Sequence, residues 1–212
     1  MEFSHMIYKV KDMDEAVKDF EDMGFTVIKD KVNSNIWFED GLFIDLCYVN
    51  YSKCSVFLMK LIGLKGLAKH LQYYKDADVG FIDYSLENNR DDLIPENGAL
   101  KKLGYKFSSF TMRKKYSTGE KLKWKITFPY ILDLPFLVGA GSFKERMKPK
   151  GIVHKNGATG IEKVIWGVDS KYIEDINSLY DDKRLELVKG KGFQSIKING
   201  YTGDAFEKKY YK

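Results

Sequence analysis

The chain opens with Phe3-Ser-His-Met-Ile-Tyr-Lys-Val10, a mainly apolar run that predicts a β-strand. It continues with Asp12-Met-Asp-Glu-Ala-Val-Lys-Asp-Phe-Glu-Asp-Met-Gly24, in which apolar residues recur at helical spacing between an acidic start and a glycine. An aspartate before a helix accepts a hydrogen bond from the first turn, and a glycine just past the last turn ends the helix. Phe25-Thr-Val-Ile28 then predicts a second strand. This stretch therefore predicts a strand, a helix and a strand in immediate succession.

The same order of elements occurs twice more along the chain. The second copy has its strand, helix and strand at 79–86, 90–104 and 105–107. The third copy has them at 161–168, 169–180 and 185–188. Repeated units of this kind usually pack against one another. We therefore expect modules that share one core rather than independent domains.

We expect an α+β fold in which all modules belong to a single domain over residues 1–212. In the first module, three strands follow the helix, and Glu39-Asp-Gly41 predicts a hairpin turn between the last two, because Asp-Gly suits positive φ. The expected parts are the first module at 1–59, a linker helix at 60–76, the second module at 77–141, and a partial third module with the tail at 142–212.

Composition and charge indicate an ordinary soluble globular protein. Hydrophobic residues make up 44% of the 212 residues, charged residues make up 31%, and the net charge is +5. The strongest basic stripe is Met112-Arg-Lys-Lys-Tyr116 with Lys121, Lys123 and Lys125. Strand alternation sends these last three lysines to one face of a half-buried strand, which is an ordinary solvated surface. We therefore expect no nucleic-acid partner.

The cysteines and the hydropathy pattern favour a cytoplasmic location. Cys47 and Cys54 are seven residues apart, a spacing that fits neither a zinc site nor a disulfide framework. The opening Met-Glu-Phe-Ser-His does not resemble a signal peptide. The longest apolar run, 130–140, contains Asp133 and Pro135 and falls short of the ~20 residues that span a bilayer. We expect no membrane partner.

Several short motifs occur in a recognisable order along residues 3–168. They are Ser4-His5-Met-Ile-Tyr-Lys-Val10, Asp12-Met-Asp-Glu-Ala16, Gly24-Phe25, 35–38, Leu42-Phe-Ile-Asp-Leu46, 119–128, Leu134-Pro-Phe136 and His154-Lys-Asn-Gly157. In this order and spacing the chain resembles the glyoxalase-like domain proteins of the vicinal oxygen chelate superfamily. The resemblance implies paired β-α-β-β-β modules that curl into a half-barrel mixed sheet, with a third, partial β-α module here. It also implies that a small molecule binds in the concave cleft of this sheet.

The metal-dependent members of this superfamily hold a divalent ion with a His or Glu from the first and last strands of two modules. On that pattern His5 and Asp45 fall on the two ligand positions of the first module. Aligning the second module places Phe81 opposite His5 and Gly139 near the carboxylate position, and neither residue can bind a metal. Asp83, two residues from Phe81, is expected to share its face and could contribute instead. Catalytic zinc normally takes three protein ligands, so we expect no metal cofactor and an incomplete site.

His5 and Asp45 are also the candidate catalytic residues. A carboxylate on an apolar strand needs a donor or a cation, and His5 is the expected partner of Asp45 in an acid/base couple. His154 lies in a glycine-bounded loop, where it either binds a ligand at the pocket mouth or satisfies the local backbone. His70, on the linker helix, is expected at an interface or on the surface.

The aromatic residues of the predicted strands belong either to the core or to a cavity wall. Trp37, Phe81, Trp124 and Phe136 are the candidates for lining a cavity, together with His5, Asp45, Asp83 and His154. An aromatic cavity with one acid and one histidine favours an apolar or aromatic small molecule. The sequence contains no nucleophile elbow, phosphate-binding loop or dinucleotide fingerprint.

Three functions remain open. The first is a glyoxalase-like protein that binds a small organic molecule without a complete metal site. The alternative is a lyase, isomerase or dioxygenase that depends on a divalent metal held by His5, Asp45 and Asp83. The third is an interaction module whose exposed sheet edges pair with a second copy to form a homodimer.

Overall fold

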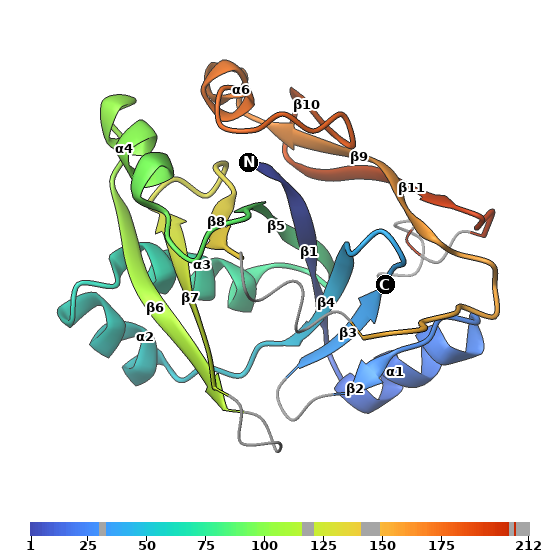
Figure 1. Ribbon diagram of the computed structural model, residues 1–212. Coiled ribbons are helices and arrows are strands. Elements are labelled where there is room, and N and C mark those ends of the chain that lie inside the picture. Colours follow the sequence, from blue (N-terminus) through green and yellow to red (C-terminus); the bar gives the residue numbers. More distant parts are fainter. Residues whose placement is uncertain (30–32, 116–120, 141–148, 204–205, 207–212) are drawn as a thin grey trace.

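Figure 1 shows the computed structural model, which describes residues 1–29, 33–115, 121–140, 149–203 and 206. Within these residues five helices and eleven strands form an α+β fold, which confirms the predicted class. Eight strands form one large mixed sheet, and the other three form a smaller sheet. The large sheet ends at β2 and β6, which do not pair with each other, so it is not closed into a barrel.

The large sheet is built from two runs of strands that follow the same order of pairing. The first run comprises β1 (Glu2–Val10), α1 (Met13–Asp22), β2 (Ile28–Lys29), β3 (Asn33–Trp37) and β4 (Phe43–Tyr48). The second comprises β5 (Gly80–Asn88), α4 (Ile94–Lys102), β6 (Phe107–Lys115), β7 (Lys121–Pro129) and β8 (Phe136–Gly139). The strand order is β2-β3-β4-β1-β5-β8-β7-β6. β1 is parallel to β4, β5 is parallel to β8, and the two runs meet where β1 and β5 pair antiparallel.

Helix α1 forms as its sequence predicts. The Asp12 carboxylate accepts a hydrogen bond from the Glu15 amide at 2.9 Å and caps the first turn. Val17 and Phe20 are its buried residues and pack into the core. The chain then turns at Gly24, whose φ is +86°. A Cβ at Gly24 would lie 2.9 Å from Asn156, so only glycine fits the turn.

The two faces of the large sheet are covered by different elements. The first face packs against α1, α4 and the smaller sheet, in a core that includes Tyr8, Ile44 and Tyr84. The second face packs against α2 (Lys53–Leu61) and α3 (Lys65–Asp76), in a core that includes Ile7, Leu71 and Trp124.

The connection between the two runs differs from the single linker helix that the sequence predicts over 60–76. It contains two helices, and the first begins at Lys53, inside the stretch expected to belong to the first module. Ser52 caps this helix by accepting a hydrogen bond from the Ser55 amide. Gly63, with a φ of +85°, separates α2 from α3. The prediction missed α2 because its exposed side chains are mostly apolar, so it lacks the polar face of an ordinary surface helix.

The smaller sheet contains β9 (Gly160–Val168), β10 (Leu185–Lys189) and β11 (Gly192–Asn199), with α6 (Ser170–Asn177) between the first two. Its strand order is β10-β9-β11. Trp166 of β9 packs on Tyr84, and Phe193 of β11 packs on Phe81, with ring centroids 5.0 Å and 4.5 Å apart. The smaller sheet therefore covers the first face over β5, above the centre of the large sheet in Figure 1.

Helix α3 approaches the second face so closely that one position must be glycine. A Cβ at Gly66 would lie 2.1 Å from the backbone oxygen of Phe128. We expect Gly66→Ala to lower the free energy of unfolding by about 1–3 kcal/mol, because the added methyl must push α3 away from β7.

Chemical denaturation of both the wild type and the variant measures this loss. Gly98→Ala in α4 is the matched control, since a Cβ there meets no atom within 4 Å. The control should gain about 0.5–1 kcal/mol from the better helix propensity of alanine. Equal effects of the two substitutions would show that α3 does not pack on β7 as described.

Candidate functional site

Two β-bulges between β1 and β5 decide which side chains face each side of the sheet. Ser4 is the extra residue in β1, because Phe3 pairs with Leu86 and His5 pairs with Ser85. Ile82 is the extra residue in β5, because Ile7 pairs with Asp83 and Tyr8 pairs with Phe81. Bulges re-aim the side chains around them and are common beside functional sites.

The bulge at Ile82 overturns the expected placement of two candidate residues. Phe81 packs on Tyr8 with ring centroids 5.0 Å apart and belongs to the core of the first face. Asp83 contacts α3 on the second face. The expectation that Phe81 and Asp83 share a face is therefore wrong, because the extra residue between them breaks the strand alternation.

The register also corrects the expected equivalence of the two runs. His5 pairs with Phe43 of β4, and Ser85 pairs in the same way with Phe136 of β8. Ser85, and not Phe81, therefore occupies the position that corresponds to His5. Asp45 lies two residues after Phe43, so the corresponding residue is Val138, one position before the expected Gly139.

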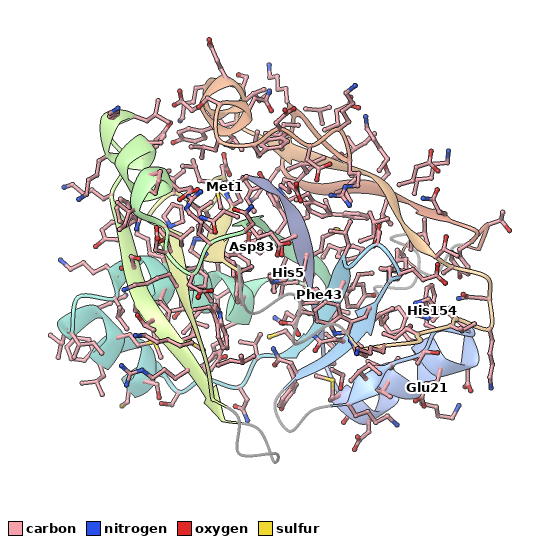
Figure 2. The ribbon with its side chains drawn as sticks, in the orientation of Figure 1. Met1, His5, Glu21, Phe43, Asp83 and His154 are labelled. Carbon is pink, nitrogen blue, oxygen red and sulfur yellow. The ribbon has the colours of Figure 1, made fainter. Side chains whose placement is uncertain are left out.

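His5 lies on the second face and is held by two serine hydroxyls. Its Nδ1 lies 2.9 Å from Ser4 Oγ and 2.7 Å from Ser85 Oγ. Its ring stacks on Phe43 with centroids 4.3 Å apart, and Figure 2 shows the two residues side by side. The edge of Phe136 completes its surroundings. Burial lowers the pKa of His5 to about 3, so the imidazole is neutral at physiological pH.

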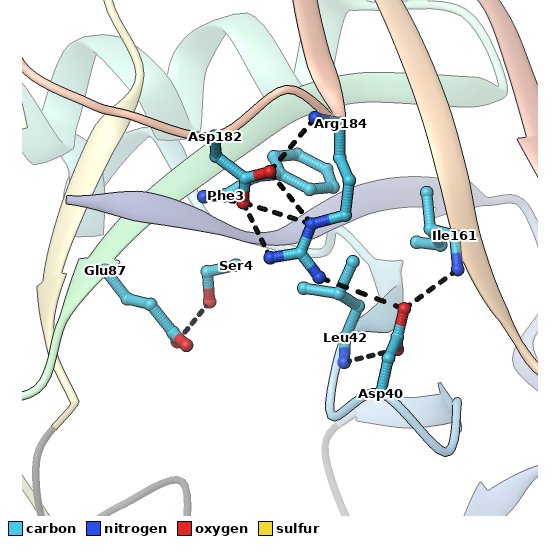
Figure 3. A network of polar contacts seen from close by, with 8 residues as sticks. All are labelled: Phe3, Ser4, Asp40, Leu42, Glu87, Ile161, Asp182 and Arg184. Atoms are coloured by element: carbon cyan, nitrogen blue, oxygen red, sulfur yellow. Dashed lines mark hydrogen bonds and ion pairs between the residues drawn. The ribbon is translucent and has the colours of Figure 1, made fainter.

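A hydrogen-bonded chain leads from His5 to a buried carboxylate. Ser4 Oγ donates to Glu87 Oε2 at 2.6 Å while it also contacts His5 (Figure 3). The bulge at Ser4 brings these groups together, because it turns Ser4 toward the same side as His5 and Glu87. Glu87 is not among the residues that the sequence predicts to bind a ligand. The signal for it was a charged residue near the end of an apolar strand, as it was for Asp83.

Asp45 does not pair with His5, contrary to the prediction from the sequence. Its carboxylate accepts hydrogen bonds from the side-chain amides of Asn33 and Asn35, at 3.0 Å and 2.9 Å. Its backbone position is across from Ile7, whereas His5 lies across from Phe43. The two asparagines on β3 supply the donors that a partly buried carboxylate needs.

The Asp83 carboxylate accepts hydrogen bonds from two side chains of α3, and these bonds hold the helix on the sheet. Its Oδ2 lies 2.8 Å from His70 Nδ1 and accepts a hydrogen bond from the Tyr74 hydroxyl. Its Oδ1 accepts from the Tyr84 amide at 2.8 Å. His70 Nε2 lies 3.2 Å from the Pro129 carbonyl. Both ring nitrogens of His70 therefore face hydrogen-bond acceptors. His70 is completely buried between α3 and the sheet, so of the two expected positions the surface is wrong.

His154, like His70, stabilises a connection between different parts of the fold. Its Nδ1 accepts from the Thr26 amide at 2.9 Å, and its Nε2 donates to the Trp37 carbonyl at 3.0 Å. These bonds fix a neutral tautomer, and burial lowers the pKa of His154 in agreement with this. Of the two roles that the sequence left open, the geometry matches satisfaction of the backbone. Figure 2 shows His154 apart from His5 and Asp83.

The remaining aromatic candidates form a layer on the second face. Trp37 stacks on Phe43 with centroids 4.2 Å apart, on the side away from His5. Phe136 stacks on Phe128 at 5.1 Å. Trp124 is buried in the same core. Of these rings, Phe43 and Phe136 contact His5 directly and contribute to the burial that lowers its pKa.

A cavity of about 1100 Å³ lies where β1 begins and β5 ends. Its wall includes Glu87, the β3–β4 turn around Asp40, and residues 149–153. None of the eight residues predicted to bind a ligand belongs to its described lining. His5 reaches it only indirectly, through Ser4 and Glu87.

The described wall of this cavity is rich in carboxylates. The acidic residues are Glu2, Glu39, Asp40, Glu87, Glu96 and Asp181, and the basic ones are Arg90 and Lys150. Arg90 and Glu96 form an ion pair at 2.5 Å.

Asp40 is fixed at the rim of the cavity. It accepts from the amides of Leu42 and Ile161, at 3.0 Å and 3.1 Å, and lies 3.9 Å from the Arg184 guanidinium (Figure 3). Arg184 in turn forms a two-pronged pair with Asp182. These contacts join the smaller sheet to the turn that borders the cavity, so this part of the wall is held in place.

Comparison with known proteins agrees with the fold and the motifs. The glyoxalase-like domain family matches residues 3–182. The chain belongs to this family. The glyoxalase-like domain places it in the vicinal oxygen chelate superfamily, as its motifs predict. A search of curated proteins finds no match.

One similar solved structure is titled "Crystal Structure of a hypothetical protein from Staphylococcus aureus". It is 17% identical, the match covers 91% of this chain and 88% of that chain, and the TM-score is 0.65. At this identity the likeness shows a shared fold.

The described part of this glyoxalase-like domain contains no group of three His, Cys, Asp or Glu side chains arranged to hold a metal ion. His5, Asp45 and Asp83 all lie on the second face, but the Asp83 carboxylate already accepts three hydrogen bonds. The helices described are also too short or too polar to span a membrane.

The lowered pKa of His5 makes stability depend on pH. Its folded-state pKa is about 3 and its unfolded value is 6.5, so the unfolded chain takes up the proton first as the pH falls. The stabilisation is fully present above pH 6.5 and is lost progressively between there and about pH 3. From pH 7 to pH 5 we expect His5 to account for a loss of about 2 kcal/mol.

Denaturation of the wild type and of His5→Asn at both pH values measures this contribution. The other titrating groups are common to both proteins and cancel in the comparison. The variant should lose about 2 kcal/mol less than the wild type over this interval. The same loss in both would mean that His5 is accessible to protons in the folded state.

Proposed function

We propose that this glyoxalase-like domain protein binds a small polar organic molecule in the cavity beside Glu87, without a complete metal site. The observation that carries the proposal is the chain from Glu87 through Ser4 to His5. It links the wall of the cavity to the histidine that the family motif places on the first strand. A cavity with a few convergent polar groups is the usual form of a small-molecule site.

The chemistry of the wall supports a polar ligand rather than the aromatic one that the strand residues suggested. The aromatic side chains Trp37, Trp124 and Phe136 are buried, and none of them belongs to the described lining. Carboxylates outnumber cations in that lining. Carboxylates accept hydrogen bonds, so they favour a ligand with ammonium, amide or hydroxyl donors.

The register supports binding without the metal of the metal-dependent relatives. Ser85 and Val138 occupy the positions of the second run that correspond to His5 and Asp45. A valine cannot bind a metal, and a serine hydroxyl is a weak ligand beside histidine and carboxylate. The proposed contribution of this chain is therefore shape and hydrogen bonding, with Glu87 as the group best placed to accept or hold a proton.

The alternative function is a lyase, isomerase or dioxygenase that uses a divalent metal. One observation favours it, since His5 and Asp45 lie on adjacent strands and on the same face of the sheet. Metal content separates the two functions. Elemental analysis of protein purified without chelator, and again after incubation with zinc, nickel, manganese or iron(II), should give far less than one ion per chain.

The matched variant in that measurement is His5→Ala. Near-stoichiometric metal in the wild type that is lost in His5→Ala would contradict the proposal and establish the metal-dependent alternative.

Ligand binding is tested by a thermal-shift screen of small amines, amino alcohols and polyols. A compound that binds should raise the melting temperature of the wild type, because it binds the folded state alone. Glu87→Gln should reduce the shift, and Glu174→Gln, on the exposed surface of α6, is the matched control. An unchanged shift in Glu87→Gln would place the ligand elsewhere.

A further inference from the structure

Helix α2 carries an exposed apolar surface. Phe57, Leu58, Leu61 and Ile62 are 62%, 58%, 66% and 64% exposed. They lie at positions i, i+1, i+4 and i+5, so they share one side of the helix and its last turn. Monomeric soluble proteins rarely expose contiguous apolar patches larger than a few hundred Å². We call these four residues the α2 patch.

The patch projects from the body of the protein. Val56 is the buried residue of α2 and packs into the core of the second face, so the four exposed residues face outward. Figure 1 places α2 at the outer edge of the molecule, beside α3.

The segment that contains the patch carries only positive charge. Residues 46–75 contain five lysines and neither aspartate nor glutamate, although the whole chain has 30 acidic residues. Lys60 and Lys65 are exposed beside the patch, and neither forms an ion pair with any residue that the structure describes. An apolar patch with exposed lysines beside it is complementary to an anionic surface that has an apolar layer beneath it.

We propose that α2 docks on an anionic lipid membrane surface. Amphipathic helices of this type lie in the plane of the interface, with their apolar side about 5–10 Å deep and lysines at the headgroup level. Each lysine near such a surface strengthens binding to anionic lipids.

A second copy of the chain fits this surface less well. A two-fold contact would set each patch against itself and bring the lysines of both copies together. Like charges that face each other across an interface oppose association.

This surface contact differs from the expectation of no membrane partner. That expectation rested on the lack of a spanning segment, and the sequence did not reveal that the apolar side of α2 faces outward.

The test is co-sedimentation of the full chain with vesicles. Phosphatidylcholine vesicles are compared with vesicles that also contain phosphatidylglycerol. The wild type should bind the mixed vesicles and show little binding to the neutral ones, and added salt should weaken the binding.

Phe57→Ser combined with Leu61→Ser should weaken binding by at least about tenfold, because it removes two large apolar side chains. Lys60→Glu combined with Lys65→Glu should also weaken it at least about tenfold.

Matched controls come from α4. Ile94→Ser replaces an apolar residue that is 75% exposed, and Lys101→Glu with Lys102→Glu reverses two exposed lysines. Both should bind like the wild type. All of the substituted residues are exposed, so the variants should keep the wild-type melting temperature within a few degrees.

Three results would overturn the proposal. The first is no binding to either kind of vesicle, and the second is binding that neither α2 variant reduces. The third comes from light scattering of the protein without lipid. A dimer mass that falls to the monomer mass in Phe57→Ser with Leu61→Ser would assign the patch to a second copy.

Discussion

The buried carboxylate of Asp83 is the constraint on which the rest of the arrangement depends. A carboxylate on an apolar strand is costly to bury unless donors surround it. His70 and Tyr74 supply two of these donors from α3, and the Tyr84 amide supplies the third. Burial and the negative charge of Asp83 raise the pKa of Tyr74 well above its usual value. The Tyr74 hydroxyl therefore stays protonated and donates a hydrogen bond to Asp83. The need to satisfy Asp83 therefore holds α3 against the second face of the sheet.

The position of α3 determines where a small molecule can bind. The helix and the aromatic layer around Phe136 and Trp124 fill the second face over the strands of the second run. The cavity lies instead at the end of β1 and β5, where Glu87 reaches its wall. The bulge at Ser4 connects this end of the sheet to His5. His5 is neutral in its apolar surroundings, and its contact with Ser4 helps to position the Glu87 carboxylate. A ligand in the cavity would therefore contact Glu87 rather than the imidazole of His5.

Much of the fold could be predicted from the sequence, and most of the site could not. The capped helix after Asp12, the turn at Gly24 and the strand 42–49 follow from local rules that the structure obeys. The family also follows from short motifs such as Leu42-Phe-Ile-Asp-Leu46. The bulges at Ser4 and Ile82 depend on how β1 and β5 pair, which no local pattern specifies. One extra residue in each strand was enough to misplace Phe81 relative to His5 and Asp83. The burial of His70 likewise depends on a partner that lies 13 residues away in sequence, on another element.

A double-mutant cycle between His70 and Asp83 tests most directly whether this pair holds α3 on the sheet. The free energies of unfolding of the wild type, His70→Asn, Asp83→Asn and the double variant are measured under the same conditions. Each single variant should lose about 3–5 kcal/mol, because it leaves one member of a buried pair without its partner. The double variant should lose clearly less than the sum of the two. Additive losses, or an Asp83→Asn variant as stable as the wild type, would contradict the account and return Asp83 to the residues available for a ligand or a metal.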